Sequence, residues 1–133
     1  MKLGISGDAL VDVFPDKIIK LAQDTLKNNG RVFIITKLSL SESRLKLIEL
    51  MSSHLISKPF WNQIYSIPDY AKQKNIPHWF KLNGEFSFLR DKDFYITKSN
   101  IVNEIGLDLY LDDCENSVEY FNPGVFCLMK TKR

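Results

Sequence analysis

The chain has 133 residues, of which 44% are hydrophobic and 26% are charged, and its formal net charge is +2. This length suits a single domain over residues 1–133, with a core large enough to fold without disulfides or a structural metal. So small a charge does not predict a polyanionic partner, and we do not expect the chain to bind nucleic acid. No apolar run approaches the ~18 residues of a membrane span, so no membrane partner is expected.

The two cysteines, Cys114 and Cys127, form no CxxC motif and have no histidine close in sequence. This spacing gives no support for a zinc site. Small secreted domains usually carry more cysteines, and residues 1–5 are too short for the apolar part of a signal peptide. We therefore expect reduced thiols and a cytoplasmic protein.

The N-terminal part of the chain has the pattern of a strand, a loop and a helix. Residues 2–5 form a short extended piece that is apolar after Lys2, and residues 6–8 follow as a loop. Pro15 suits the first turn of a helix, where its missing N–H would have no partner. Apolar residues then recur at helical spacing as far as Gly30, which we expect to end the helix in the left-handed conformation.

The middle of the chain continues this alternation. Residues 32–35 are four consecutive β-branched or aromatic residues, which is typical of a strand buried on both faces in a parallel sheet. Ser39 and Glu42 have the spacing of a capping box at the start of the next helix. A further strand is predicted over residues 63–67, followed by a short helix over residues 68–74.

The segment 78–95 departs from the alternation. Asn83-Gly84 is a strong signal for a β-hairpin, and aromatic residues flank it on both sides. We expect a small β insert here, too short to be a large cap domain. Its aromatic side chains fit core and lid packing, with stacking on a base or sugar as the alternative.

The last third of the chain contains a helix, a strand, a short helix and a final strand. The first helix is predicted over residues 99–105, with Lys98 at its start and Gly106 as its cap. A strand over residues 107–111 then ends at the pair Asp112-Asp113.

These alternating patterns predict an α/β fold. We expect a Rossmann-like parallel sheet of about five strands, with helices on both faces and the small β insert. Ile5, Ile35 and Leu111 should end neighbouring strands on one edge of this sheet.

Ligands of open parallel sheets bind at the carboxyl ends of the strands. The candidate residues are those that follow the apolar runs, together with the lysine before the Leu107 strand: Ser6, Gly7, Asp8, Thr36, Lys98, Asp112 and Asp113. Carboxylate oxygens suit Mg²⁺, and a lysine suits a phosphate group. The structural alternatives are an ordinary turn for the acidic pair, a surface position for the lysine, and helix or turn capping for the others.

The region from Lys98 to Asp113 resembles the third and fourth motifs of the haloacid dehalogenase-like superfamily, in which a lysine opens a helix and the next strand ends in paired acids. Residues 114–119 are also similar to family members. Residues 32–36 resemble the second motif, an apolar strand that ends in Thr or Ser. The order and spacing of the motifs carry this resemblance over most of the chain.

The resemblance implies a site that binds Mg²⁺ and a phosphoryl group. By that similarity, Asp112 and Asp113 would hold Mg²⁺. Asp8, a further carboxylate expected at the same strand ends, would help them. Thr36 and Lys98 would bind the phosphoryl group, and Gly7 would let the backbone approach it.

The first motif is where the chain departs from the family pattern, which is an apolar strand followed by Asp-x-Asp. Here the sequence is Ser6-Gly7-Asp8, so that Asp8 fits the second acid and Ser6 stands at the position of the nucleophile. The sequence around Asp12 also resembles the family's flanking residues, which leaves a shift of the alignment open. A serine hydroxyl is a weak nucleophile without a base beside it, so the covalent route should be lost or very slow.

Three functions remain open from the sequence. The first is a capless, phosphatase-like pseudoenzyme that binds Mg²⁺ and a phosphorylated small molecule or phospho-macromolecule. The second is an active Mg²⁺-dependent phosphohydrolase that uses Asp8 or Asp12. The third is a non-catalytic protein-interaction domain that contacts its partner through the aromatic insert.

Overall fold

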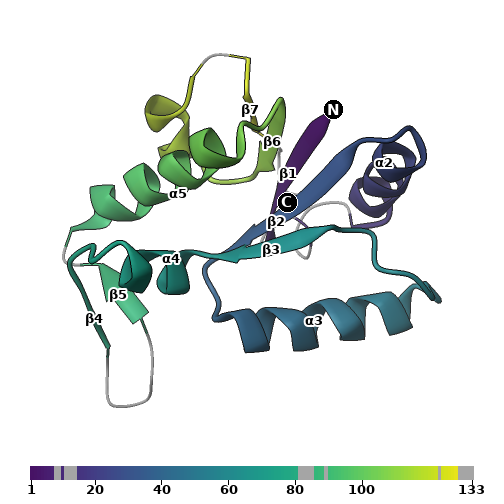
Figure 1. Cartoon of the computed structure of the whole chain (residues 1–133), viewed down its shortest axis with the longest axis horizontal. Coiled ribbons are helices and arrows are strands. Elements are labelled where there is room, and N and C mark those ends of the chain that lie inside the picture. Colours follow the sequence, from purple (N-terminus) through teal and green to yellow (C-terminus); the bar gives the residue numbers. More distant parts are fainter. Residues whose placement is uncertain (8–9, 11–14, 81–85, 89, 123, 129–133) are drawn as a thin grey trace.

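A five-stranded parallel sheet forms the centre of the computed structural model, which describes all residues except 8–9, 11–14, 81–85, 89, 123 and 129–133 (Figure 1). The strand order is β3-β2-β1-β6-β7. The strands are β1 (Lys2–Ser6), β2 (Arg31–Thr36), β3 (Gln63–Ser66), β6 (Leu109–Asp112) and β7 (Phe126–Leu128). The predicted α/β, Rossmann-like fold with about five parallel strands is confirmed.

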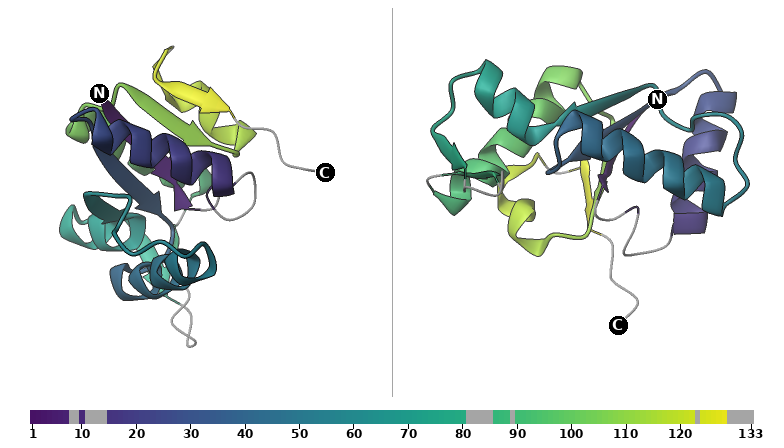
Figure 2. Two further views of the ribbon diagram at one scale, coloured as in Figure 1. Left: turned by 90° about the vertical axis from the view of Figure 1, so that its right-hand side faces the viewer. Right: turned by 90° about the horizontal axis from the view of Figure 1, so that it is seen from below.

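Helices cover both faces of this sheet, as predicted (Figure 1, Figure 2). They are α2 (Pro15–Lys27), α3 (Leu40–Ser53), α4 (Ile67–Gln73) and α5 (Asp91–Ile105), followed by the 3-10 helix η1 (Glu115–Tyr120). No described helix is long and apolar enough to cross a membrane.

The alternation of side chains along β2 divides the core in two. Val32 and Ile34 belong to the cluster that includes residues of α2 and α3. Phe33 and Ile35 belong to the cluster that includes residues of α4 and α5. Because successive residues of a strand point to opposite faces, an all-apolar strand needs a helical layer on each side.

The predicted β insert is present as a separate antiparallel pair, β4 (His78–Phe80) and β5 (Phe86–Phe88). The Asn83-Gly84 turn that predicted it lies outside the described residues. Figure 1 shows the pair at one end of the molecule, beside α4 and the start of α5.

The start of α5 differs from the prediction. Lys98 was expected to open this helix, but α5 begins seven residues earlier, at Asp91, so that Lys98 lies in its middle. Asp91 and Asp93 occupy the first turn, where carboxylates favour a helix N-terminus. Arg90, the N-cap residue, donates two hydrogen bonds of 2.9 Å to the Asp93 carboxylate. The aromatic residues around position 94 obscured this first half of the helix in the sequence.

The helix caps were predicted in part. Ser39 accepts a hydrogen bond from the N–H of Glu42 at 3.3 Å and so caps α3 as expected. The left-handed residue after α2, however, is Asn29 (φ 64°) rather than Gly30. Asn tolerates this conformation better than most residues with a side chain. Gly30 serves close packing instead, because a Cβ there would lie 2.7 Å from the carbonyl oxygen of Met1.

Gly106 ends α5 with φ 75°, and its N–H donates to the carbonyl of Val102. Gly106→Ala should therefore lower the free energy of unfolding by about 1–2 kcal/mol, because an L side chain is strained in the left-handed conformation. Urea unfolding checks this value. Asn103→Ala, at an exposed position of the same helix, is the control and should be neutral or slightly stabilising. Equal losses in the two variants would contradict the assignment of the cap.

Candidate functional site

Parallel pairing brings three polar strand ends to the same edge of the sheet. In the observed register Ser6 lies opposite Ile35, and Thr36 lies opposite Ser66. Ile5 lies opposite Leu111, so Ser6 and Asp112, which come next on these two strands, lie side by side. Ser6 on the central strand thus lies between the ends of β2 and β6, and Ser6, Thr36 and Asp112 are all buried.

A buried ion pair lies at the end of β6. The Lys98 Nζ is 2.8 Å from Oδ2 of Asp112, and the two side chains are only 6% and 1% exposed. The ammonium group also donates to the Ser117 Oγ at 3.4 Å, and it lies 4.9 Å from the centre of the Phe94 ring. The other oxygen of Asp112 accepts a hydrogen bond from the N–H of Cys114 at 3.1 Å. Lys98 is therefore not a surface lysine, and the structure joins it to the acid with which the sequence grouped it.

Sequence reasoning did not identify Ser117 or Phe94 as neighbours of Lys98. Ser117 is fully buried in η1. A serine in a short polar helix and a phenylalanine among other aromatics give no local signal of this role. Ser117 reaches Lys98 because η1, which follows β6, packs against α5. Phe94 lies four residues before Lys98 in α5, so the two side chains share one face of that helix.

Gly7 and Thr36 lie against one another at the end of the central strands. A Cβ added to Gly7 would be 3.2 Å from both Cβ and Oγ1 of Thr36, so a larger residue at position 7 would crowd the threonine. The Thr36 Oγ1 accepts a hydrogen bond from the N–H of Leu38 at 3.1 Å. This bond forms a local turn before α3, whose cap is Ser39 rather than Thr36, and it leaves the Thr36 hydroxyl proton able to donate to a ligand.

The described residues do not by themselves assemble the predicted magnesium site. No group of three or more His, Cys, Asp or Glu side chains suited to a metal occurs among them. Asp112 is committed to Lys98, and Asp113 is half-buried beside it. Asp8 and Asp12 lie outside the described part of the chain. The metal therefore stays a prediction that depends on Asp8.

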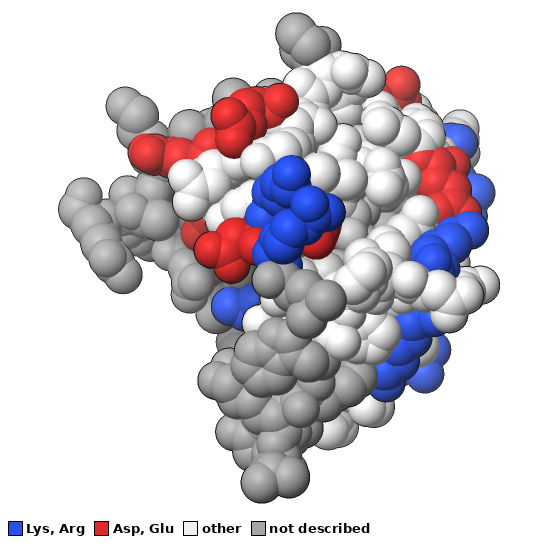
Figure 3. Space-filling model, turned by 90° about the vertical axis from the view of Figure 1, so that its left-hand side faces the viewer, with Lys and Arg blue, Asp and Glu red and all other residues white. Residues whose placement is uncertain are grey.

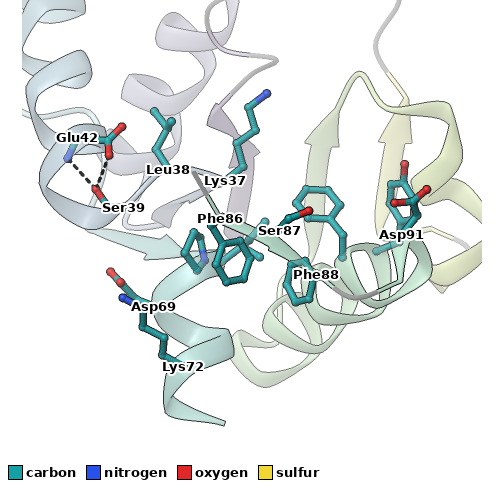
Figure 4. Close-up of a pocket in the computed structure, with 14 residues that line it drawn as sticks. Lys37, Leu38, Ser39, Glu42, Asp69, Lys72, Phe86, Ser87, Phe88 and Asp91 are labelled. Carbon is teal, nitrogen blue, oxygen red and sulfur yellow. Dashed lines mark hydrogen bonds between the residues drawn. The ribbon is translucent and has the colours of Figure 1, made fainter. Parts of the chain in front are cut away.

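A pocket of about 640 Å³ opens next to these strand ends. It lies between the first turns of α3 and α4, strand β5 and the start of α5. Figure 4 shows Phe86 and Phe88 in the middle of the lining, with Glu42 and Asp69 on one side and Asp91 on the other. The sequence favoured packing for the aromatic side chains of the insert, with stacking on a base or sugar as the alternative, but it did not locate this pocket.

The side of the molecule that carries the start of α5 has no dominant charge. Figure 3 shows acidic and basic residues interspersed over its described surface, without a large patch of one sign. This distribution agrees with the low net charge of the chain and offers no extended track for a polyanion.

Comparisons with protein-family models, with curated proteins and with solved structures found no match to this chain.

Proposed function

We propose that this chain is a phosphatase-like domain of the haloacid dehalogenase-like type that binds the phosphoryl group of a phosphorylated ligand, with turnover weak or absent. The observation that carries the proposal is the buried Lys98–Asp112 pair beside Ser6 at the carboxyl edge of the sheet. This edge is where open parallel sheets bind their ligands.

Stability alone does not explain why the Lys98–Asp112 ion pair is buried. The desolvation of two charges roughly offsets their attraction, and an apolar pair of similar size often stabilises a core as well or better. Charged groups kept at such a position are therefore candidates for function. The acid and the lysine belong to the two motifs on which the family resemblance rests.

Each residue of the edge has a part in the proposal. A lysine has three N–H donors, and among the described residues Asp112 and Ser117 use two of those on Lys98. No other described residue accepts from the third, and the proposal assigns this donor to a phosphoryl oxygen. The Thr36 hydroxyl donates to a second oxygen, and Gly7 leaves space for the ligand to approach the backbone.

Magnesium enters the proposal as a weakly bound ion held by Asp112 or Asp113 together with Asp8. Mg²⁺ keeps several of its waters in sites with few protein ligands, and it would add positive charge beside the phosphoryl group. The weakness follows from Lys98, which already neutralises Asp112 at 2.8 Å.

Titration calorimetry with inorganic phosphate, with and without Mg²⁺, tests the proposal. Thr36→Val should weaken phosphate binding about tenfold, because it removes one hydrogen bond to a charged ligand. Thr25→Val is the matched control, since Thr25 is also buried and its hydroxyl donates to the Leu21 carbonyl within α2. The control should bind as wild type does. No binding by wild type, or equal loss in both variants, would refute the proposal.

A protein-interaction role is the second candidate, and α3 favours it. Leu45 and Ile48 on this helix are 63% and 56% exposed, which is unusual for neighbouring large apolar side chains. If phosphate does not bind and Leu45→Lys abolishes association with a partner protein, the protein-interaction role is favoured over phosphoryl binding.

A further inference from the structure

The pocket adjoins the strand ends through two of its lining residues. Lys37, which lines it, directly follows Thr36. Phe94 also lines it, and the centre of the Phe94 ring is 4.9 Å from the Lys98 Nζ. A ligand whose phosphoryl group lies beside Lys98 and Thr36 can therefore extend its remaining atoms into the pocket.

The pocket wall formed by the insert and α5 is aromatic. Phe86 and Phe88 meet edge to face with ring centres 4.9 Å apart, and Phe88 meets Phe94 in the same way at 5.9 Å. The Phe86 ring also packs against His78 at 5.1 Å. Rings held by one another in this way lose little freedom when a flat ligand stacks on them.

The charged residues of the pocket favour a neutral group on the ligand, rather than a second anionic group in addition to the phosphoryl group. Glu42, Asp69 and Asp91 line it together with Lys37 and Lys72, so acidic residues outnumber basic ones. Two of these acids are held in place. Asp69 accepts a hydrogen bond from the N–H of Leu40 at 3.4 Å, and Glu42 accepts one from the Ser39 hydroxyl at 3.2 Å. Their remaining lone pairs can accept hydrogen bonds from ligand N–H or O–H groups.

We propose that the ligand is a nucleoside monophosphate, with its base stacked on Phe86 in the pocket and its phosphoryl group at the strand ends. This inference rests on the proposed function and names the class of ligand. The flat aromatic base matches the ring wall, and its N–H groups and the sugar hydroxyls match the carboxylates. The volume of about 640 Å³ lies within the range of pockets that hold small molecules.

Titration calorimetry with four probes separates the base from the phosphoryl group. The probes are guanosine 5′-monophosphate, ribose 5-phosphate, guanosine and inorganic phosphate. Guanosine monophosphate should bind at least about tenfold more tightly than ribose 5-phosphate, the gain expected from one stacked base. Guanosine should bind weakly and compete with the monophosphate.

Phe86→Leu keeps apolar bulk but removes the ring. It should reduce the affinity for guanosine monophosphate about tenfold and leave that for ribose 5-phosphate unchanged. Trp61→Leu is the matched control, because Trp61 is a half-buried aromatic in an edge-to-face pair with Phe60 and lies outside the pocket. It should change neither affinity, and thermal unfolding confirms that both variants are folded at the assay temperature.

The contrary outcomes distinguish the two proposals. Equal affinities for guanosine monophosphate and ribose 5-phosphate would overturn the nucleotide assignment and leave phosphoryl binding intact. Phenyl phosphate, titrated as a further control, should bind more weakly than guanosine monophosphate, and equal affinities would overturn the nucleotide assignment in favour of any aryl phosphate. Both proposals would be overturned if guanosine binds but inorganic phosphate does not, or if none of the four probes binds.

Discussion

Lys98→Met should lower the free energy of unfolding by about 3–5 kcal/mol, because it leaves the Asp112 carboxylate buried without its counter-charge. That carboxylate is 1% exposed and would keep only the N–H of Cys114 among the described donors. Urea unfolding at neutral pH, followed by circular dichroism, measures the loss.

The double variant Lys98→Met/Asp112→Leu should recover much of this stability, because an apolar pair of similar volume carries no desolvation cost. The surface pair Arg90–Asp93 provides the control. The Arg90 side chain is 64% exposed, so Arg90→Met should cost at most about 1 kcal/mol. If Lys98→Met costs no more than Arg90→Met, the pair is not the desolvated contact described above.

Wild-type protein should show negligible Mg²⁺-dependent hydrolysis of aryl phosphates, and Ser6→Asp should restore measurable turnover. Loss of the nucleophile can cost an enzyme on the order of a millionfold in kcat, so even partial restoration should be easy to detect. Ser6 is buried at the end of the central strand, and among the residues that the structure describes no base is hydrogen-bonded to its hydroxyl. Release of inorganic phosphate, measured under single-turnover and steady-state conditions, gives the result.

Ser6→Asn is the matched control for this substitution, because it has nearly the same size as Asp but cannot form an acyl phosphate. It should remain inactive. Robust hydrolysis by the wild type that Asp8→Asn abolishes would instead support the active phosphohydrolase, with Asp8 replacing the missing acid. Activity of Ser6→Asn equal to that of Ser6→Asp would show that position 6 is not the nucleophile's place.

The sheet and its polar edge could be predicted because their signals are local in sequence. Residues 32–35 are apolar at every position and are β-branched or aromatic, which favours a strand covered on both faces. The structure places β2 between two helical layers. Parallel pairing then fixes which strand ends meet. Ser6, Thr36 and Asp112 were identified for this reason and do share one edge.

The rest of the site could not be predicted because it depends on packing between distant segments. Lys98 reaches Asp112 from the middle of α5 rather than from its start, and Ser117 joins it from η1. The pocket forms only where β5 and α5 meet the first turns of α3 and α4. The cap after α2 was misplaced by one residue because Asn29 and Gly30 both tolerate the left-handed conformation, and tight packing at Gly30 decided between them.

A crystal structure of the protein grown with phosphate and Mg²⁺ would test the central claim most directly. We expect a phosphate ion at the ends of β1 and β2, with oxygens at hydrogen-bond distance, about 2.7–3.0 Å, from the Lys98 Nζ and the Thr36 Oγ1. Ser6 should face the phosphorus from the central strand. A saturated crystal in which phosphate binds elsewhere, while Lys98 still donates to Asp112 and Ser117 as it does here and not to phosphate, would contradict the account.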